Sequence, residues 1–432
     1  MQPAVSEALT ARSVPPQSAI GTAARVAKHV PELDGVRGAA IALVMALHFV
    51  SNSITPTNLL ELAAVKITNY GLWGVDLFFV LSGFLITGIL VESKSAPGYF
   101  RNFFVRRALR IFPLYYGVLL VLLVLVPAAV LQAIDPELVE LRGLSGWLWA
   151  YLTNVYLGPQ TSFSIPYVSH FWSLAIEEHF YLVWPFLIWC LPNRTAMRVC
   201  IVLGSLALAL RIAFTMTAPD QLYAGVLTPC RIDALCAGAW FALSARTEPR
   251  LTTARAMVLA LASGGVILTL SAWHFVLLAG EAVVLPLRTT ALAVFCGAMI
   301  YGASYNDDLR LLRAGLRLGW LRNLGKYSYG LYVFHGMVAY GMHRYDMPAY
   351  FSRLTSIHTL GAVLQISCAV GVSYALALVS FHMFESPFLS LKRFFEYSGR
   401  SALPQTDRHI PTDVRPEVGT GGLVHSSGER AQ

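Results

Sequence analysis

Long apolar runs, separated by short polar and basic stretches, extend from about residue 38 to residue 384. Several of them approach the roughly 20 residues that a helix needs to cross a hydrocarbon layer about 30 Å thick. Because lipid leaves unpaired backbone groups unsatisfied, such runs predict helices rather than open sheets. We expect an all-α polytopic membrane bundle of about ten transmembrane helices, near 38–54, 74–91, 112–131, 171–191, 198–216, 231–245, 256–278, 282–303, 325–343 and 360–384.

The composition agrees with a membrane protein. Of 432 residues, 56% are hydrophobic and 13% are charged, whereas soluble domains contain about 25% charged residues. The formal net charge of +8 fits cytoplasmic loops rich in Lys and Arg, so we expect no nucleic acid partner. The six cysteines have no CxxC spacing and lie in or beside apolar stretches, which favours buried thiols over disulfides or metal ligands.

The segment 144–158, LSGWLWAYLTNVYLG, decides the predicted topology. It is short and rich in Trp and Tyr, which suits an interfacial or re-entrant piece better than a full span. If it does not cross, all basic clusters and both termini lie on the cytoplasmic side, in line with the positive-inside rule. We therefore predict a transmembrane domain at 33–390 between disordered cytoplasmic tails at 1–32 and 391–432, the first of which lacks the apolar core of a signal peptide.

The first span carries a single histidine. In PELDGVRGAAIALVMALHFV (31–50), Asp34 and Arg37 open the helix and His48 follows Arg37 by eleven residues. Eleven residues make about three turns, so the two side chains share a face with about 16 Å of rise between them. If Arg37 lies at the membrane surface, His48 lies near the middle of the hydrocarbon layer, where an ionisable group indicates a functional site. The alternative is a histidine bonded to a serine or a carbonyl group of a neighbouring helix.

A second polar stripe lies in HFWSLAIEEHFYLVWPFL (170–187). His170, Ser173, Glu177 and Tyr181 follow the helical i, i+3, i+7, i+11 spacing, and Glu178 lies on a neighbouring face. Each glutamate costs roughly 2.5–3.5 kcal/mol or more at the bilayer centre, so packing alone is a poor explanation for two of them. We expect one of the two to pair with an arginine of another helix.

A basic amphipathic segment, YFRNFFVRRALRIFP (99–113), precedes the third span, which we expect Pro113 to open. Its arginines alternate with apolar residues; they are Arg101, Arg106, Arg107 and Arg110. The segment is either an anchor on anionic membrane lipid or a docking site for a phosphorylated ligand, and one segment can serve both purposes.

Other polar positions have both a structural and a functional interpretation. Asp76 either caps the start of a helix or belongs to the site. The small Ser82–Gly83 pair permits another helix to approach closely. Arg231 and Asp233 either extend (snorkel) to the membrane surface and cap a helix or belong to the site. The candidates for substrate contact or structural support are Asp34, Asp76, Ser82, His170, Ser173, Tyr181, Arg231, Asp233, Ser328, His335 and Glu385.

These residues predict a bundle with a central cavity lined by Arg37, His48 and Glu177 above a basic cytoplasmic platform. Two function classes fit. One is an enzyme in which a base activates a nucleophile and arginines hold an anionic donor. The other is a proton-coupled transporter that uses His48 and the glutamates as a relay. A transporter would often contain two related halves, and the sequence has no visible repeat. No ligand spacing indicates a metal.

From about Leu33 to Leu389 the chain resembles the membrane acyltransferase-3 family, bacterial integral-membrane O-acyltransferases. The resemblance rests on ordered motifs: LDGVRGAAIALVMALH, GVDLFFVLSGFLIT, RRALRIFPLYY, HFWSLAIEEHFYLVWP, RIDALCAG, GKYSYGLYVFH and a closing ESP. It implies transfer of an acyl group, commonly acetyl, from acyl-CoA to a hydroxyl of a sugar. The acceptor would be a cell-surface polysaccharide, its lipid-linked precursor or a glycosylated metabolite, and the location the bacterial inner membrane.

Carried over by residue, the resemblance makes Arg37 and His48 the essential pair and Glu177 and Glu178 the paired acids. It makes 106–110 the cytoplasmic donor-binding motif. Two positions depart from the family pattern: His179 stands where glutamine is usual, and no proline follows His335 closely. The C-terminal tail is too short for the esterase domain that some members append, so a second transfer step would need a separate periplasmic acyltransferase.

The expected mechanism uses acyl-CoA, most simply acetyl-CoA, as donor and no metal. The phosphates of CoA dock on the arginines of 101–110. His48 acts as general base on the acceptor hydroxyl or as a transient acyl carrier. Glu177 orients His48, and Arg37 stabilises developing negative charge.

Overall fold

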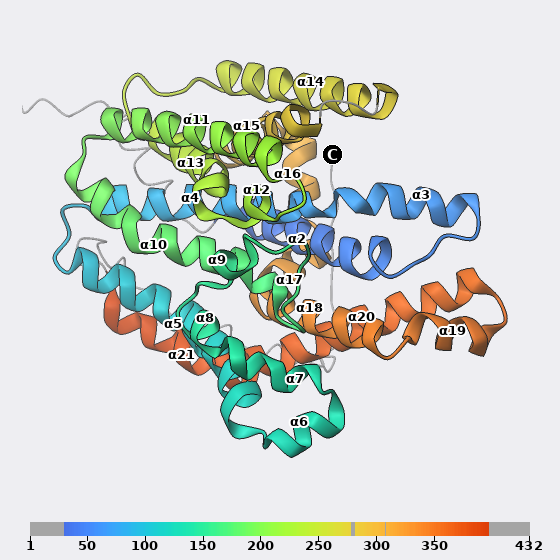
Figure 1. Cartoon of the computed structure of the whole chain (residues 1–432). Helices are drawn as coiled ribbons and strands as arrows, with labels where there is room; N and C mark the ends of the chain where they lie inside the picture. Colours follow the sequence, from blue (N-terminus) through green and yellow to red (C-terminus); the bar gives the residue numbers. More distant parts are fainter. Residues whose placement is uncertain (1–29, 278–280, 307, 397–432) are drawn as a thin grey trace, which may run out of the picture. The chain divides into compact units, whose positions relative to one another are not determined.

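The computed structural model describes residues 30–277, 281–306 and 308–396, which are helical and contain no strand (Figure 1). The all-α prediction is therefore confirmed for these residues. Most of both expected tails, 1–29 and 397–432, lies outside the described residues. Pro31 and Glu32 are already helical, as are Leu391–Phe395, so the folded region extends slightly beyond the predicted 33–390 at both ends.

Among the described residues, eight helical segments are long and apolar enough to cross a membrane. They correspond to eight of the ten predicted spans. The two other predicted spans form α10 (Trp172–Cys190) and α18 (Ser328–Arg344), so the count of ten stays a prediction. The eight segments are Pro31–Ser51, Leu59–Ser93, Tyr99–Leu125, Asn193–Thr217, Tyr223–Ser244, Thr253–Trp273, Ala282–Tyr305 and His358–Phe395.

Most of these segments combine several elements. The first joins α2 (Pro31–Ala46) to the π-helical η1 (Leu47–Ser51). In the N-terminal half, further elements are α3 (Leu59–Thr68), η2 (Asn69–Leu72), α4 (Trp73–Ser93), α5 (Tyr99–Leu120), η3 (Val121–Leu125), η5 (Ser169–Phe171) and α11 (Asn193–Thr217). They are followed by α13 (Thr228–Ser244), α14 (Thr253–Leu277), α15 (Glu281–Tyr305), α16 (Arg310–Leu316) and α17 (Gly319–Lys326). The C-terminal part contains α19 (Met347–Thr355), α20 (His358–Ser380), the π-helical η6 (Phe381–Glu385), α21 (Ser386–Ser390) and η7 (Leu391–Phe395).

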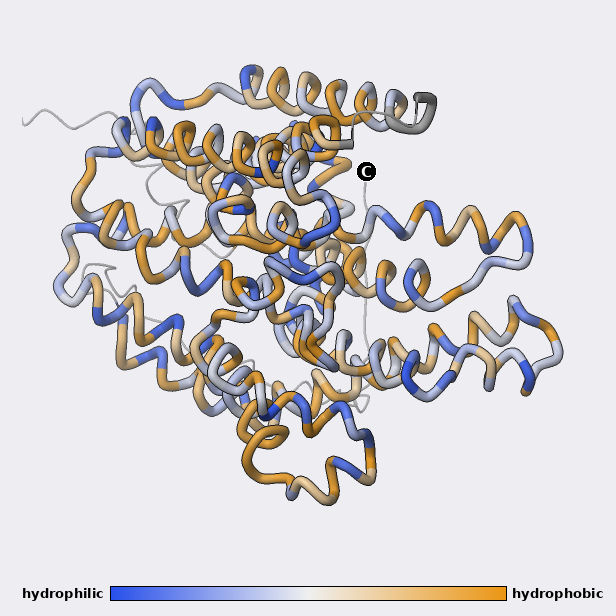
Figure 2. The backbone as a smooth tube through the Cα atoms, in the orientation of Figure 1, coloured by the Kyte–Doolittle hydropathy of each residue, from blue (hydrophilic) through white to orange (hydrophobic). Residues whose placement is uncertain are grey.

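The long helices are largely apolar along their length, with hydrophilic residues in the loops and at intervals within some helices, α3 and α5 among them (Figure 2). Their outward side chains include Leu261 and Leu268, which are 69% and 73% exposed. Apolar side chains on the outer surface of a bundle are the surface that lipid requires, so the fold is that of a multi-pass membrane protein.

The segment 144–158 is broken into α8 (Ser145–Trp149) and α9 (Thr153–Leu157). Between them Tyr151 has a φ of 54°, in the left-handed region. Each helix has five residues and is therefore only about 7.5 Å long. Neither can cross a bilayer alone, which agrees with a non-crossing segment.

Glycines allow the central helices to approach closely. A Cβ atom at Gly83 of α4 would overlap the Leu235 carbonyl of α13, and a Cβ at Gly238 of α13 would overlap the Val80 carbonyl of α4. Gly83, the small residue next to Ser82, was expected to permit close approach of another helix, and α13 is that helix.

The first helix begins at Pro31, close to the expected opening at Asp34 and Arg37, so Arg37 lies in its second turn. One predicted helix start is wrong. Pro113 lies inside α5 instead of opening a span, so the arginine segment and the third span are one helix. Proline removes only one backbone donor, and the long apolar run on its C-terminal side continues the helix past it.

The register of α2 against α4 gives the depth of Arg37. Gly71 packs against the backbone of Leu43, and Gly74 packs against the backbone of Ala40, so the two helices are antiparallel. Extending this register places Arg37 beside the first half of α4 and His48 beside the second half of α3. Arg37 thus lies at cavity depth, not at a helix end.

Candidate functional site

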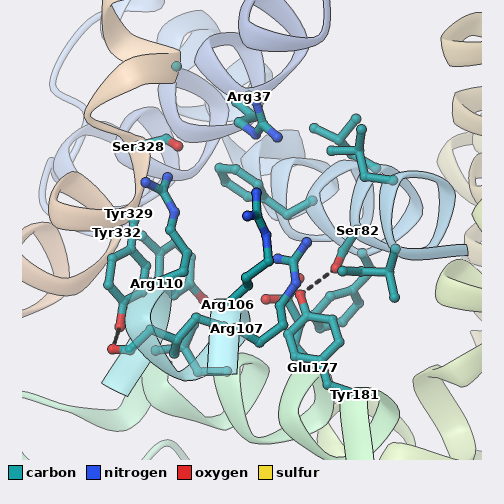
Figure 3. Close-up of a pocket in the computed structure, with 18 of the residues that line it drawn as sticks. Arg37, Ser82, Arg106, Arg107, Arg110, Glu177, Tyr181, Ser328, Tyr329 and Tyr332 are labelled. Carbon is teal, nitrogen blue, oxygen red and sulfur yellow. Dashed lines mark hydrogen bonds between the residues drawn. The ribbon is translucent and has the colours of Figure 1, made fainter. Parts of the chain in front are cut away.

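A cavity of about 740 Å³ lies between α2, α4, α5, α10, α17, α18 and the C-terminal end of the last membrane segment. Its lining along α4 runs from Val75 to Ile89, a length of about 21 Å at 1.5 Å per residue. Figure 3 shows that side chains from helices far apart in sequence surround the same space. Its polar lining consists of Asp34, Arg37, Ser82, Arg106, Arg107, Arg110, Ser173, Glu177, Tyr181, Lys326, Ser328, Tyr329, Tyr332 and Lys392.

The lining is strongly basic, with six Arg or Lys side chains against the carboxylates of Asp34 and Glu177. Arg37 Nη1 lies 2.7 Å from Asp34 Oδ1. A water-accessible space with this excess of guanidinium groups is suited to a ligand that carries several phosphates.

The four arginines of the predicted donor segment differ in their surroundings. Arg107 and Arg110 line the cavity. Arg106 also lines it, but its Nη1 donates to the carbonyl oxygens of Lys392 at 3.0 Å and Phe395 at 3.2 Å and so ties α5 to η7. Arg101 is exposed and lies outside the lining.

The stripe predicted on α10 is mostly part of the cavity wall. Ser173, Glu177 and Tyr181 line the cavity, and the Tyr181 hydroxyl lies 2.5 Å from Ser82 Oγ (Figure 3). Arg107 lies over the Tyr181 ring at 5.4 Å. The positive charge of Arg107 acts on both glutamates of α10.

Glu178 is turned away from the cavity lining. Its Oε1 atom is buried and has no hydrogen-bond partner within the described ranges. The two adjacent glutamates are therefore not equivalent, because only Glu177 faces the space in which a ligand would bind.

Three histidines from different elements form a row beside the cavity. His48 of η1 and His170 of η5 each lie 5.1 Å from His335 of α18, measured between ring centroids. Ser173 and Tyr332, which are hydrogen-bonded to each other, line the cavity next to this row. The Tyr332 ring lies 5.3 Å from the His335 ring.

The expectation that His48 lines the cavity with Arg37 and Glu177 is wrong, because His48 is absent from the lining. His48 lies eleven residues beyond Arg37, about 16 Å along the helix axis, whereas the part of α2 that lines the cavity includes only Asp34 and Arg37. The interhelical contacts of η1 with α18 bring His48 to His335 instead.

Asp76, Arg231 and Asp233 form buried ion pairs rather than caps or surface contacts. Arg231 Nη2 lies 2.6 Å from Asp76 Oδ1, and Arg211 Nη2 lies 2.5 Å from Asp233 Oδ2. Thr290 donates to the same Asp233 oxygen at 3.1 Å. Arg231 is 5% exposed, so the snorkelling alternative is wrong for this residue.

Two further candidates have different positions. Ser328 lines the cavity, whereas Glu385 is buried in η6 outside the lining and accepts a hydrogen bond from Ser380 Oγ at 3.2 Å. The charge of Arg110 acts on Glu385. Glu385 therefore supports the arginine side of the cavity from behind.

The cavity also has lining residues that were not among the candidates, namely Lys326, Tyr329, Tyr332 and Lys392, and Arg211 is a further buried charge partner. Arg211 has a sequence signal because it lies inside the apolar run 198–216, and Lys326, Tyr329 and Tyr332 belong to the motif GKYSYGLYVFH. Within the described residues there is no group of three or more His, Cys, Asp or Glu side chains placed to hold a metal ion.

Comparison with known proteins gives one family. Residues 30–382 match the model of an acyltransferase domain. The chain is 30% identical to the peptidoglycan O-acetyltransferase OatA of Listeria monocytogenes, in an alignment that covers 83% of this chain and 56% of the relative. It therefore spans just over half the length of that protein.

Two other relatives have similar identity. The acyltransferase MdmB of Streptomyces mycarofaciens is 27% identical over 79% of this chain and 88% of the relative. The O-acetyltransferase OatA of Staphylococcus aureus is 30% identical over 49% of this chain and 34% of the relative. No solved structure matches the chain.

Proposed function

The chain belongs to the acyltransferase family whose model matches residues 30–382, and we propose that this membrane acyltransferase moves an acyl group from acyl-CoA to a sugar hydroxyl. The acyl group is most simply acetyl. The acceptor is a cell-surface polysaccharide, its lipid-linked precursor or a glycosylated metabolite. We further propose that the protein resides in a bacterial plasma membrane with both termini in the cytoplasm. The name of the Listeria monocytogenes relative, a peptidoglycan O-acetyltransferase, supports transfer to a glycan.

The basic cavity is the observation that carries the proposal. CoA combines several phosphates with a long pantetheine arm that ends in the thioester. Arg106, Arg107 and Arg110 offer guanidinium groups that pair with phosphate oxygens in a bidentate manner. The cavity extends from them to Ser173 and Tyr332, so an extended donor with its phosphates on α5 would bring the thioester towards the histidine row.

His48 then supplies the base for transfer. A bare imidazole nitrogen removes the proton from the acceptor hydroxyl while the oxygen attacks the thioester carbonyl carbon. The tetrahedral oxyanion collapses, the carbon–sulfur bond breaks, and the CoA thiolate takes the proton back from the imidazolium. Arg37, which lines the cavity, is suited to stabilise negative charge on the donor. In the alternative order the imidazole attacks first, the carbon–sulfur bond breaks and the CoA thiolate leaves. The sugar hydroxyl then attacks the acyl-histidine, and the leaving imidazole takes up the hydroxyl proton and passes it to the thiolate.

Family membership favours this enzyme over a proton-coupled transporter. Base catalysis of this kind typically contributes 10²–10⁴-fold, because a sugar hydroxyl is too weak an acid to attack a thioester unaided at neutral pH. His48 is therefore the residue whose removal should affect transfer most without emptying the donor cavity.

The test uses purified protein in lipid nanodiscs, acetyl-CoA labelled in the acetyl group, and a crude envelope-glycan fraction. Native protein should release thiol in a glycan-dependent manner, and His48→Ala should lose this release by at least about 10²-fold. The matched control is His343→Ala, because His343 is an exposed histidine near the end of α18. Label that stays on native protein but not on His48→Ala supports the acyl-histidine route.

Two results contradict the proposal. Equal activity in native protein and His48→Ala would show that His48 is not the catalytic base or the acyl carrier. Absence of binding and turnover with acetyl-CoA and with longer acyl-CoA donors would show that acyl-CoA is not the donor.

A further inference from the structure

His335 has a ring tautomer that its surroundings determine. The residue is completely buried. Its Nδ1 atom lies 2.7 Å from the carbonyl oxygen of Tyr332 and 3.1 Å from that of Leu331. Carbonyl oxygens only accept hydrogen bonds, so Nδ1 carries the proton. In the neutral ring, Nε2 is then a bare acceptor, and it is buried without a hydrogen-bond partner among the described residues.

Of the three rings next to His335, two have their polar hydrogens engaged elsewhere. His170 Nε2 lies 3.0 Å from the Val333 carbonyl oxygen, so the one N–H of a neutral His170 is directed there. The Tyr332 hydroxyl bonds to Ser173 and to the His170 carbonyl. This leaves the N–H of His48 to satisfy His335 Nε2.

The spacing of the two rings fits such a bond. In two coplanar imidazole rings joined by an N–H···N hydrogen bond, the nitrogens are about 2.9 Å apart and each lies about 1.15 Å from the centroid of its ring. The two centroids are then about 5.2 Å apart. The His48 and His335 centroids are 5.1 Å apart with 60° between the ring planes. The two rings are therefore close enough for an N–H of His48 to reach Nε2 of His335.

We propose that His335 is the positioning residue of His48: its bare Nε2 accepts the N–H of His48 and thereby leaves the other nitrogen of His48 bare. This inference rests on the proposed function, in which that bare nitrogen is the base or the acyl acceptor. A base held in one tautomer by a third group is the arrangement that activates many nucleophiles. A neutral imidazole serves here where other enzymes use a carboxylate, which suits a site embedded in a low-dielectric bundle.

The bond also accounts for the proton during transfer. When His48 takes the proton of the acceptor hydroxyl, its second N–H remains donated to His335, and the imidazolium keeps an acceptor for that hydrogen. When the CoA thiolate leaves, the proton passes from His48 to sulfur. His335 gains and loses no covalent bond in this sequence.

Two substitutions separate this role from a structural one. In His335→Gln the side-chain oxygen reaches the position of Nε2 and can accept from His48, but the donor at Nδ1 is lost. In His335→Asn the amide nitrogen can replace Nδ1 and donate to the Tyr332 carbonyl, but nothing replaces Nε2. A structural role predicts that Asn preserves activity better than Gln, and the positioning role predicts the opposite.

The experiment measures kcat and the KM for acetyl-CoA from thiol release in nanodiscs, with thermal unfolding of each variant alongside. His335→Gln should stay within about tenfold of native kcat, and His335→Asn should fall by roughly 10²–10⁴-fold. The KM should be unchanged in both, because His335 does not line the donor cavity. Equal losses in the two variants, or the reverse order, would overturn the proposal.

A second measurement leaves His335 in place. In protein labelled with ¹⁵N-histidine, native His335 should give the signals of an Nδ1–H tautomer with a hydrogen-bonded Nε2. The His48→Ala variant should shift that Nε2 resonance, and an unshifted resonance would overturn the proposal. This measurement needs no turnover. A failure of the acyltransfer assay in native protein would therefore count against the proposed function, whereas the NMR spectrum would still test the hydrogen bond between His48 and His335.

Discussion

Replacement of Arg231 by methionine tests whether a buried ion pair holds the wall of the cavity. The guanidinium lies 2.6 Å from Asp76 Oδ1 and 5.9 Å from the ring centroids of Phe79 and Trp172. Phe79 itself lines the cavity. Arg231 and Asp76 are 5% and 2% exposed, so water cannot replace either partner once the other is removed.

The magnitude follows from the charge that is left behind. Breaking a buried pair by removing one partner typically costs about 3–5 kcal/mol, whereas replacing both partners by apolar groups of similar volume is often neutral. We therefore expect Arg231→Met and Asp76→Leu each to lower the free energy of unfolding by about 3–5 kcal/mol. The double variant should lie within about 2 kcal/mol of native protein, which gives a coupling energy of at least about 4 kcal/mol.

The assay is an SDS titration of purified protein in mixed micelles, followed by tryptophan fluorescence. The matched control is Arg250→Met: Arg250 Nε lies 2.9 Å from Glu248 Oε1, but the two side chains are 51% and 76% exposed. Removing such a pair should change the free energy of unfolding by less than about 1 kcal/mol. A single-variant cost as small as that of the control, or a double variant as unstable as the sum of the two single ones, would refute the reasoning.

Two further predictions concern the donor end and the helix packing. Arg107→Gln and Arg110→Gln should each raise the KM for acyl-CoA about tenfold or more, because a hydrogen bond to a charged group contributes about 1.5–3 kcal/mol. Arg101→Gln should leave it unchanged because Arg101 is outside the lining; equal effects in all three variants, measured by thiol release at varied donor concentration, would contradict the docking site. Gly238→Val should cost more than about 3 kcal/mol or prevent folding because its Cβ overlaps the backbone of α4. Gly371→Val, which faces open space, should be tolerated in the same unfolding assay, and similar losses at both glycines would disprove the close-packing argument.

The helices and much of the cavity could be predicted from the sequence because both depend on local patterns. Apolar runs identify the spans, and the spacing of Ser173, Glu177 and Tyr181 places them on one face of α10, which lines the cavity. The cluster of Arg107 and Arg110 also lies there. Periodicity within one helix is sufficient for such statements, because residues three or four apart share a face.

The partners across helices could not be predicted in this way. Arg231 has Asp76 as its partner, from a helix about 155 residues away in sequence, and periodicity contains no information about how two helices are rotated against each other. The same limit explains why His335 was expected only as support, although it is in contact with His48. The tautomer of His335 depends on carbonyl groups of its own helix, which no side-chain pattern reports.

The position of His48 follows from the rise of its helix. His48 lies eleven residues beyond Arg37, about 16 Å along the axis, and the part of α2 that lines the basic cavity includes only Asp34 and Arg37. The π-helical turn at Leu47–Ser51 holds His48 against His335 instead. Such π-helical turns are rare, and they are frequent at functional sites. Under the proposed mechanism this distance would separate two tasks: a donor in the basic cavity would approach the base only with its thioester end, beside Ser173 and Tyr332, which lie next to the histidine row. An acceptor that reaches His48 from the η2 side would then meet the thioester at that single point, which would limit transfer to acceptors able to enter from that side.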